Sequence, residues 1–412
     1  MPASSSSLIN PVLDQLAGLP DPDRELLAGG LPNLLHYLAW VPDPRDRRGV
    51  RHSLVSILGL ATAAALAGSR GFTAIGEWVL DASPQVWAAF GVRRDPLTRK
   101  FESPDEATIR RVVEDVDADA LDAAIGSWPA SALRSRQTNR PPAGSAGRRR
   151  ALAVDGKALR ATHHHTTDSQ ALHLLSVLDQ AAGIVLNQTN VQGKTNEITR
   201  FRPLLEPLDL TGAVVTADAL HTQRDHAEFL VTRKDAHYIL AVKKNQPSLY
   251  SQLKGLPWRK VPITHAENDH GHGRDERRTV KIVSVTQGLL FPHTAQAIAI
   301  TRRTRQAGTK KWKTITAYAV TSLATHQATP TEIASWIRGH WSIEALHHVR
   351  DVSFGEDASQ VRTGNGPRVM ATFRNLVTGI LRLTGHDNIA AAQRHHSRNP
   401  VRTLTTLGIS PA

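Results

Sequence analysis

The chain has 412 residues, 40% of them hydrophobic and 21% charged, which is typical of a folded protein of two or three domains and excludes a wholly disordered one. Lys and Arg number 50 against 37 Asp and Glu, and the resulting net charge of +13 favours a polyanionic partner, most simply nucleic acid. The absence of cysteine excludes disulfides, thiolate metal sites and cysteine nucleophiles, and is compatible with a reducing cytoplasm.

The N-terminal region, residues 1–134, is predicted to be a helical accessory or DNA-binding domain. It shows no basic start followed by an apolar stretch, so no signal peptide is expected. Residues 54–67 are too few to span a bilayer and predict a buried helix, and residues 72–79 predict another. Ser103-Pro104-Asp105-Glu106 predicts a capping box with Pro at the first helical position. The charged segment 43–51 is either a solvated loop or a contact to DNA phosphates.

A compositional break at residues 135–150, rich in Pro, Gly, Ser and Arg, predicts a solvated linker. Beyond it, the pattern changes to short apolar runs that predict strands. The predicted order is β-β-β-α-β-α-β, at residues 151–155, 173–179, 184–191, 197–205, 213–218, 223–234 and 237–242. Three antiparallel strands followed by αβ units is the order of the ribonuclease H-like fold. The first part of that α/β core would span residues 151–254.

Residues 255–325 predict a β-rich insertion that interrupts the core. Its apolar runs lie at 278–286, 296–301 and 314–320. A helical segment opens after Thr329-Pro330-Thr331-Glu332 and belongs to the C-terminal part of the core, residues 326–412. On that segment Trp336 and Trp341 are predicted to be core anchors.

Two aspartates end predicted strands that are neighbours in a ribonuclease H-like sheet. Asp155 ends the first strand and Asp218 the fourth, so their carboxylates would meet at one edge. Hard divalent cations such as Mg²⁺ prefer oxygen ligands, and a pair of them supports in-line phosphoryl displacement. A third acid is required, and Glu344 lies on the long helix after the insertion. For either aspartate alone, a turn former or a helix cap is the commoner role.

Several strings in the chain resemble one known family. These are AVDGKALR (153–160), TADALHTQ (216–223), YILAVKKNQP (238–247), GHGRDERR (271–278) and a longer string over 340–376. They resemble the H-repeat-associated insertion-sequence transposases, which belong to the DDE transposases. Residues 41–78 resemble the accessory domain that precedes the catalytic domain in that family.

The resemblance implies a DNA transposase whose catalytic acids are Asp155, Asp218 and Glu344, acting as ligands of Mg²⁺ or Mn²⁺. It implies hydrolysis at the ends of the element to free a 3′-hydroxyl, and attack of that hydroxyl on target DNA. The implied partner is double-stranded DNA, both terminal repeats and target. A dimer on DNA is expected because two ends are usually brought together by two protomers. The expected location is the cytoplasm, in association with the nucleoid.

Side chains around the three acids are candidates for DNA contact. His221 and Gln223 follow Asp218 and are placed to contact the scissile phosphate or a metal-bound water. The other candidates are basic or amide side chains after the fifth strand, in the insertion and near the third acid: Lys243, Lys244, Asn245, Arg274, Arg338 and Arg350.

The third acid has competitors in Asp351, Glu356 and Asp357. Glu344 is favoured because it shares one helical face with His340 and with His347 or His348. Its spacing to His347 is also that of di-iron sites in helical bundles, but such a site needs a second copy of the motif, which the sequence lacks.

The sequence departs from the family pattern around the third acid. Related transposases place an Arg before the glutamate and a Lys about two turns after it. Here these positions hold His340 and Asp351, although Arg338 and Arg350 are close enough to substitute. Elsewhere, the histidines at 163–165 and at 270 and 272 predict solvated loops rather than metal sites.

Two other functions stay open. A catalytically inactive or domesticated relative would bind DNA without cutting it. A structure-specific nuclease on the same fold would cut branched DNA without joining strands.

Overall fold

The computed structural model describes residues 32–48, 50–138, 149–163, 171–191, 197–271, 273–285 and 288–410. Most of the predicted linker and His164, His165 and His272 lie outside the described residues.

The described part of the N-terminal region, from residue 32 on, is helical, as predicted. Its helices are α3 (Leu34–Leu38), α4 (Leu54–Leu66), α5 (Phe72–Asp81), α6 (Pro84–Ala89), α7 (Glu106–Asp115) and α8 (Ala118–Thr138). The predicted capping box is wrong in its register. The cap of α7 is Asp105, whose carboxylate accepts a hydrogen bond from the Thr108 N–H at 2.7 Å, so Ser103 and Pro104 precede the helix.

One sheet organises the rest of the molecule. Within the described residues it has nine strands in the order β3-β2-β1-β4-β5-β9-β8-β7-β6. The first five in the chain are β1 (Ala151–Leu159), β2 (Leu172–Asp179), β3 (Ile184–Val191), β4 (Val214–Ala217) and β5 (His237–Val242). β1 pairs antiparallel with β2 and parallel with β4, and β4 pairs parallel with β5. The predicted adjacency of the first and fourth strands is therefore confirmed.

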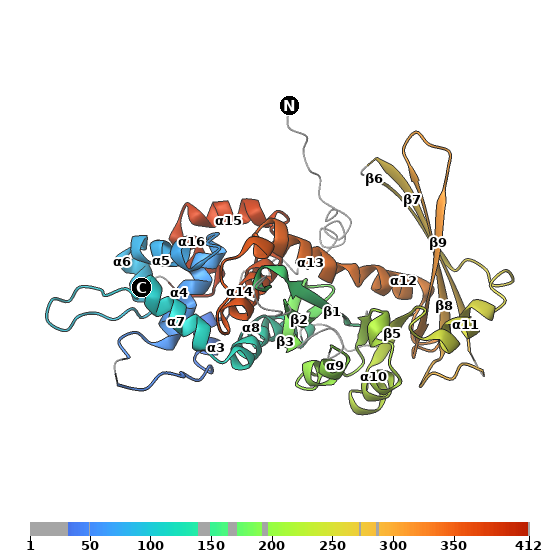
Figure 1. The fold of residues 1–412 in the computed structure, drawn as a ribbon, viewed down its shortest axis with the longest axis horizontal. Helices are drawn as coiled ribbons and strands as arrows, with labels where there is room; N and C mark the ends of the chain where they lie inside the picture. The colour runs from blue at the N-terminus through green and yellow to red at the C-terminus, as the bar shows by residue number, and fades with distance from the viewer. Residues whose placement is uncertain are drawn as a thin grey trace.

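The β-rich residues after β5 continue the same sheet. They form β6 (His265–Gly271), β7 (Arg274–Ser284), β8 (Gln296–Gln306) and β9 (Lys313–Thr321). β9 pairs antiparallel with β5, which covers an edge that would otherwise leave backbone groups unpaired. These strands lie at one end of the molecule, and one end of them extends past the neighbouring helices (Figure 1). β6 escapes prediction because its sequence, HAENDHG, has no apolar alternation.

Helices cover the sheet and connect it to the N-terminal region. They are α9 (Glu197–Leu205), α10 (Arg224–Glu228), α11 (Pro247–Gly255), α12 (Pro330–Gly339), α13 (Trp341–Val352), α14 (Gly366–Leu383), α15 (Ile389–Ser397) and α16 (Pro400–Thr406). The helix predicted to open after Thr329-Pro330-Thr331-Glu332 begins at Pro330, and the structure adds a capping box in which Thr329 and Glu332 each bond the other's backbone N–H. Among the described residues, no helix combines the length and apolar character needed to cross a membrane.

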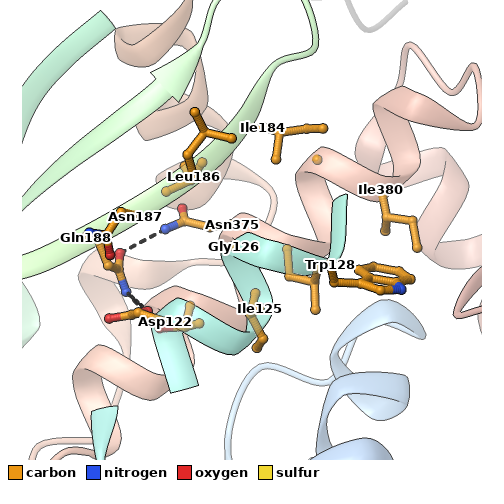
Figure 2. A pocket seen from close by; sticks show the side chains of 14 residues that line it. Asp122, Ile125, Gly126, Trp128, Ile184, Leu186, Asn187, Gln188, Asn375 and Ile380 are labelled. Atoms are coloured by element: carbon orange, nitrogen blue, oxygen red, sulfur yellow. Dashed lines mark hydrogen bonds between the residues drawn. The ribbon is translucent and has the colours of Figure 1, made fainter. Parts of the chain in front are cut away.

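The N-terminal helices share their hydrophobic core with α13 to α16. At this junction α8, β3 and α14 enclose a small pocket with one polar end (Figure 2). There the Gln188 amide donates to Asp122 at 2.8 Å and the Asn375 amide donates to Gln188 at 2.9 Å. The Arg368 guanidinium completes the network on Asp122 at 2.7 Å. The core strands and the N-terminal helices are thus joined by buried packing and by buried hydrogen bonds.

Candidate active site

The two predicted aspartates lie side by side on neighbouring parallel strands. The β1–β4 ladder runs from Ala151 opposite Val214 to Val154 opposite Ala217. Asp155 and Asp218 are the residues that follow the last pair, Val154 and Ala217, so they lie at equivalent positions along the two strands. The prediction that the first strand ends at Asp155 is wrong, because β2 continues to pair with β1 as far as Leu159.

Asp218 also serves as a cap, which was the alternative interpretation of an aspartate at a strand end. It precedes the 3-10 turn η4 (Ala219–His221), and its Oδ1 accepts the N–H groups of Leu220 at 2.9 Å and His221 at 3.4 Å. The turn therefore fixes the direction of this carboxylate at the end of β4.

Asp155 is subject to the negative charges of the other two predicted acids. Burial raises the pKa of Asp155 to about 7, and the negative charges of Asp218, Glu344 and Glu197 add to that rise, against a hydrogen bond from the Gly156 N–H. In the ranges that the structure describes, no three His, Asp or Glu side chains stand close enough together to hold a metal ion. The fold thus brings the carboxylates within electrostatic range without closing them into a ligand set.

The junction of α12 and α13 is fastened to the sheet beside Asp218. Thr216, two residues before Asp218 on β4, bonds its hydroxyl to Nδ1 of His340 at 3.0 Å. Gly339 permits this approach, since a Cβ there would lie 2.2 Å from Oε1 of Gln180, and Gln180 itself donates to the Thr216 hydroxyl at 2.9 Å. α13 therefore begins at the aspartates.

The face of α13 that meets the sheet carries the predicted polar stripe. His347 is buried with Nδ1 3.7 Å from Oδ2 of Asp155, and burial holds its pKa well below the usual range, so its ring is neutral. Glu344 lies one turn earlier and is exposed, while His348 faces solvent. The stripe consists of His340, Glu344 and His347.

The competing acids are each engaged by a basic partner. Asp351 accepts two hydrogen bonds from the Lys157 ammonium, at 2.7 and 2.8 Å. Glu356 is 1% exposed and is held by Arg350 and Arg374 at 2.8 and 2.9 Å. Asp357 lies 3.6 Å from Arg160. Their interactions leave Glu344 as the acid on α13 that acts on Asp155.

Two of the predicted DNA contacts are wrong because the side chains are buried. Arg350 is 0% exposed and neutralises Glu356, so it has no surface for a phosphate. His221 is also 0% exposed, and its Nε2 lies 3.0 Å from Oε1 of Glu197. Both residues were predicted to contact DNA from their charge and their position in the sequence, and neither property shows whether a side chain is buried.

The other predicted DNA contacts differ in availability. Lys243 and Lys244 are exposed after β5, and Asn245 is exposed but donates to the Ala219 carbonyl at 2.6 Å. Arg338 reaches across to β6 and pairs with Glu267 at 2.8 Å. The remaining two candidates are partly exposed: Gln223, which donates to the Leu220 carbonyl, and Arg274, which lies 3.8 Å from Glu276.

Trp341 is not the core anchor that the sequence predicted. It is 46% exposed, whereas Trp336 is 5% exposed and agrees with the prediction. The guanidinium groups of Arg278 and Arg302 lie 5.3 and 5.4 Å from the Trp341 ring. Trp341 precedes Glu344 by three residues, so the helical spacing already indicated that the two share a face. The arginines come from β7 and β8, which sequence spacing did not relate to α13.

Comparisons with known proteins agree along most of the chain. A family model described as "Transposase DDE domain" matches residues 146–379, and one described as "DDE_Tnp_1-associated" matches residues 35–129. "Putative transposase YncI" of Escherichia coli O157:H7 is 29% identical over 377 residues, which cover 85% of this chain and 88% of the relative. "H repeat-associated putative transposase YhhI" of Escherichia coli (strain K12) is 28% identical over 373 residues, covering 85% and 90%.

Among solved structures, the cryo-EM structure of a piggyBac transposase synaptic complex with hairpin DNA aligns with a TM-score of 0.39 at 10% identity. The alignment covers 96% of this chain and 80% of that one. So low a score marks a loose likeness and bears on no residue.

Proposed function

Because the chain belongs to the family of DDE-domain transposases, we propose that it cuts DNA at the ends of an insertion sequence and joins the freed 3′-hydroxyl to target DNA. The observation that carries this proposal is the common height of Asp155 and Asp218 on parallel strands, with the charge of Glu344 acting on Asp155. We take these three acids as the catalytic set.

A ribonuclease H-like core is part of the same proposal. Two features support it: β1 to β5 with α9 and α10 follow the chain order β-β-β-α-β-α-β that the sequence predicted for that fold, and β1 lies beside β4 as predicted. The two aspartates follow the last residue pair of the β1–β4 ladder.

The donor set suits Mg²⁺ or Mn²⁺. Asp155, Asp218 and Glu344 offer hard oxygen donors, and a divalent cation would offset the repulsion that helps raise the pKa of Asp155. When bound, such ions activate an attacking oxygen and stabilise the leaving one. The chain itself supplies the alignment: the strand register and the η4 turn orient the aspartates, and the Thr216–His340 contact starts α13 beside them.

DNA would lie along the side of the sheet that carries these acids. Trp341 with Arg278 and Arg302 offers an exposed aromatic ring and positive charge one helical turn from Glu344. Exposed Lys243 and Lys244 would contact phosphates beyond β5, with Asn245, Arg274 and Arg338 as further candidates. A dimer on DNA follows from the need to cut two ends together.

The test uses DNA that carries the element's own terminal repeats, with Mg²⁺ present. Asp155→Asn and Asp218→Asn are expected to abolish nicking and joining, because each removes a charged oxygen ligand. Asp225→Asn is the control, since Asp225 is an exposed aspartate in the first turn of α10. Undiminished nicking by Asp155→Asn would overturn the catalytic set.

The same assay separates the other two functions. Binding in a gel shift without cleavage at any Mg²⁺ or Mn²⁺ concentration would indicate a DNA-binding relative without activity. Cleavage of branched DNA without strand joining would indicate a nuclease.

A further inference from the structure

A buried carboxylate with two histidine partners lies next to the segments that carry the two aspartates. Glu197, the first residue of α9, has a side chain that is 8% exposed. Its Oε2 lies 3.0 Å from Nε2 of His173, and its Oε1 lies 3.0 Å from Nε2 of His221. Since each oxygen already has a histidine partner, Glu197 is not a further metal ligand.

One arm of this cluster reaches the strand of Asp155. His173 belongs to β2, opposite Ala158 of β1. Gly156, the neighbour of Asp155, lies against both partners: a Cβ on it would be 2.3 Å from Nε2 of His173 and 2.8 Å from Oε1 of Glu197. β1 can therefore sit this close to the cluster because residue 156 has no side chain.

The other arm reaches the turn of Asp218. His221 is the last residue of η4, whose cap is the Asp218 carboxylate, and the backbone N–H of His221 is one of the donors to Oδ1. The His221 ring is fully buried against Phe201 of α9, with ring centroids 5.1 Å apart. Glu197 thus contacts the side chain of His221 in this turn, while Asp218 accepts hydrogen bonds from the backbone of the same turn.

The charge on Glu197 suits this role. Burial acts to raise the pKa of Glu197, but the nearby rings of His173 and His221 outweigh burial and lower it to about 2. The carboxylate is therefore ionised at neutral pH. It forms a charge-assisted hydrogen bond with the His221 ring, which is stronger than a neutral one, and lies 3.0 Å from Nε2 of His173.

From this geometry we propose that Glu197 is a positioning residue for the catalytic aspartates. Through His173 it fixes β1 at Gly156, through His221 it fixes the turn that Asp218 caps, and together these contacts set the separation of the two carboxylates. The inference rests on the proposed function, because it assumes that Asp155 and Asp218 bind metal together.

The experiment measures Mn²⁺ binding directly, by electron paramagnetic resonance of free Mn²⁺ in titrations of the full chain without DNA. Glu197→Gln keeps the size of the side chain and removes its charge. We expect its dissociation constant for Mn²⁺ to rise by about 10-fold, the lower end of the range for losing a direct partner of a metal ligand, because Glu197 acts through one further residue. Glu206→Gln, an exposed glutamate just after α9, is the matched control and should bind as the wild type does.

Two further readouts separate positioning from a purely structural role. At saturating DNA the nicking rate of Glu197→Gln should fall, while the DNA concentration for half-maximal rate stays unchanged. Gly156→Ala, which pushes on the same two side chains, should weaken Mn²⁺ binding similarly, and the double variant should be little worse than either single one. If Glu197→Gln fails to fold, Gly156→Ala and His173→Gln, each of which perturbs one arm, carry the same test.

The outcomes distinguish the two levels of the argument. No Mn²⁺ binding by the wild type, or unchanged binding by Asp155→Asn, would refute the proposed function. Binding by the wild type that is lost in Asp155→Asn but intact in folded Glu197→Gln would overturn the positioning role alone. A lower melting temperature with an unchanged dissociation constant would show that Glu197 stabilises the fold without positioning the aspartates.

Discussion

The partner of each acidic side chain around α13 decides what that side chain can do. Glu344 is exposed and acts on Asp155, whereas Glu356 is enclosed by Arg350 and Arg374. A buried, paired carboxylate of this kind belongs to the architecture of the core. The two glutamates are separated by 12 residues and differ in role because of what surrounds them.

Replacement by glutamine should therefore affect activity at position 344 and stability at position 356. Glu344→Gln is expected to abolish DNA nicking with little change in melting temperature, because its side chain faces solvent and the site. Glu356→Gln should lower stability by about 3–5 kcal/mol, because two buried guanidinium groups lose their counter-charge. Thermal unfolding alongside a nicking assay checks both, and a stable, inactive Glu356→Gln would reverse the choice of third acid.

Buried histidines make the fold sensitive to acid. Burial lowers the pKa of His226 to about 4, from an ordinary value of 6.5, so its ring is neutral in the folded state. Its contribution to stability is complete above pH 6.5, where the unfolded chain is also neutral. That contribution is lost as the pH falls from 6.5 to 4, because the unfolded chain takes up a proton that the folded chain refuses.

At low pH, His226 alone should lower the free energy of unfolding by up to about 3 kcal/mol. Urea unfolding at pH 7.5 and pH 5 should show a smaller drop in stability for His226→Gln than for the wild type. His395 is exposed on α15, so His395→Gln serves as the control and should keep the wild-type dependence. Equal drops for all three proteins would remove His226 as a cause of acid sensitivity.

At the scale of elements, close approaches of helices to the sheet depend on single glycines. α8 crosses β3 at Gly126, where a Cβ would lie 2.1 Å from the backbone carbonyl oxygen of Leu186 (Figure 2). A backbone atom cannot move aside as a side chain can. The packing of α8 on β3 therefore requires a residue without a side chain.

Gly126→Ala should separate α8 from β3 and lower the free energy of unfolding by about 1–3 kcal/mol. At Gly255, the last residue of α11, an added Cβ would meet no atom within 4 Å, so Gly255→Ala is the matched control. We expect that control to be neutral or slightly stabilising, because alanine favours helix. Chemical denaturation measures both, and equal stability of the two variants would contradict the proposed crossing constraint.

At the scale of the whole molecule, the shared hydrophobic core supports the site, and the net positive charge favours binding of DNA. A shared core joins the N-terminal helices to α13–α16, so both ends of the described chain support the helix that carries Glu344. The sheet extension β6–β9 projects beyond these helices (Figure 1). The chain carries a net charge of +13 while its candidate site is made of carboxylates, and this combination suits binding a polyanion around a few metal ligands.

DNA affinity should consequently fall steeply with salt. Each phosphate neutralised by Lys or Arg lowers the slope of log K against log salt concentration by about 0.9. Lys243→Ala with Lys244→Ala should make that slope shallower, because both side chains are exposed beyond β5. Fluorescence anisotropy between low and moderate salt measures the slopes, and a flat wild-type response would contradict phosphate binding by a basic surface.

The sequence by itself determined the features that depend on neighbouring residues. Apolar runs marked β2, β3 and β5 within a residue of their bounds, and Thr329-Pro330-Thr331-Glu332 marked the start of α12. Asp155 and Asp218 were found because each directly follows an apolar run, and chain order was enough to make their strands neighbours. Such signals are local, so they survive without knowledge of the fold.

The tertiary structure decided everything that depends on distant partners. Arg350 carries the same charge as an exposed arginine, but residues 356 and 374 bury it. Trp341 has the large aromatic side chain typical of a core residue, but the fold leaves it exposed beside arginines from β7 and β8. Glu197 gains its two histidines from β2 and η4. Burial and pairing arise between segments far apart in the chain, so no local pattern encodes them.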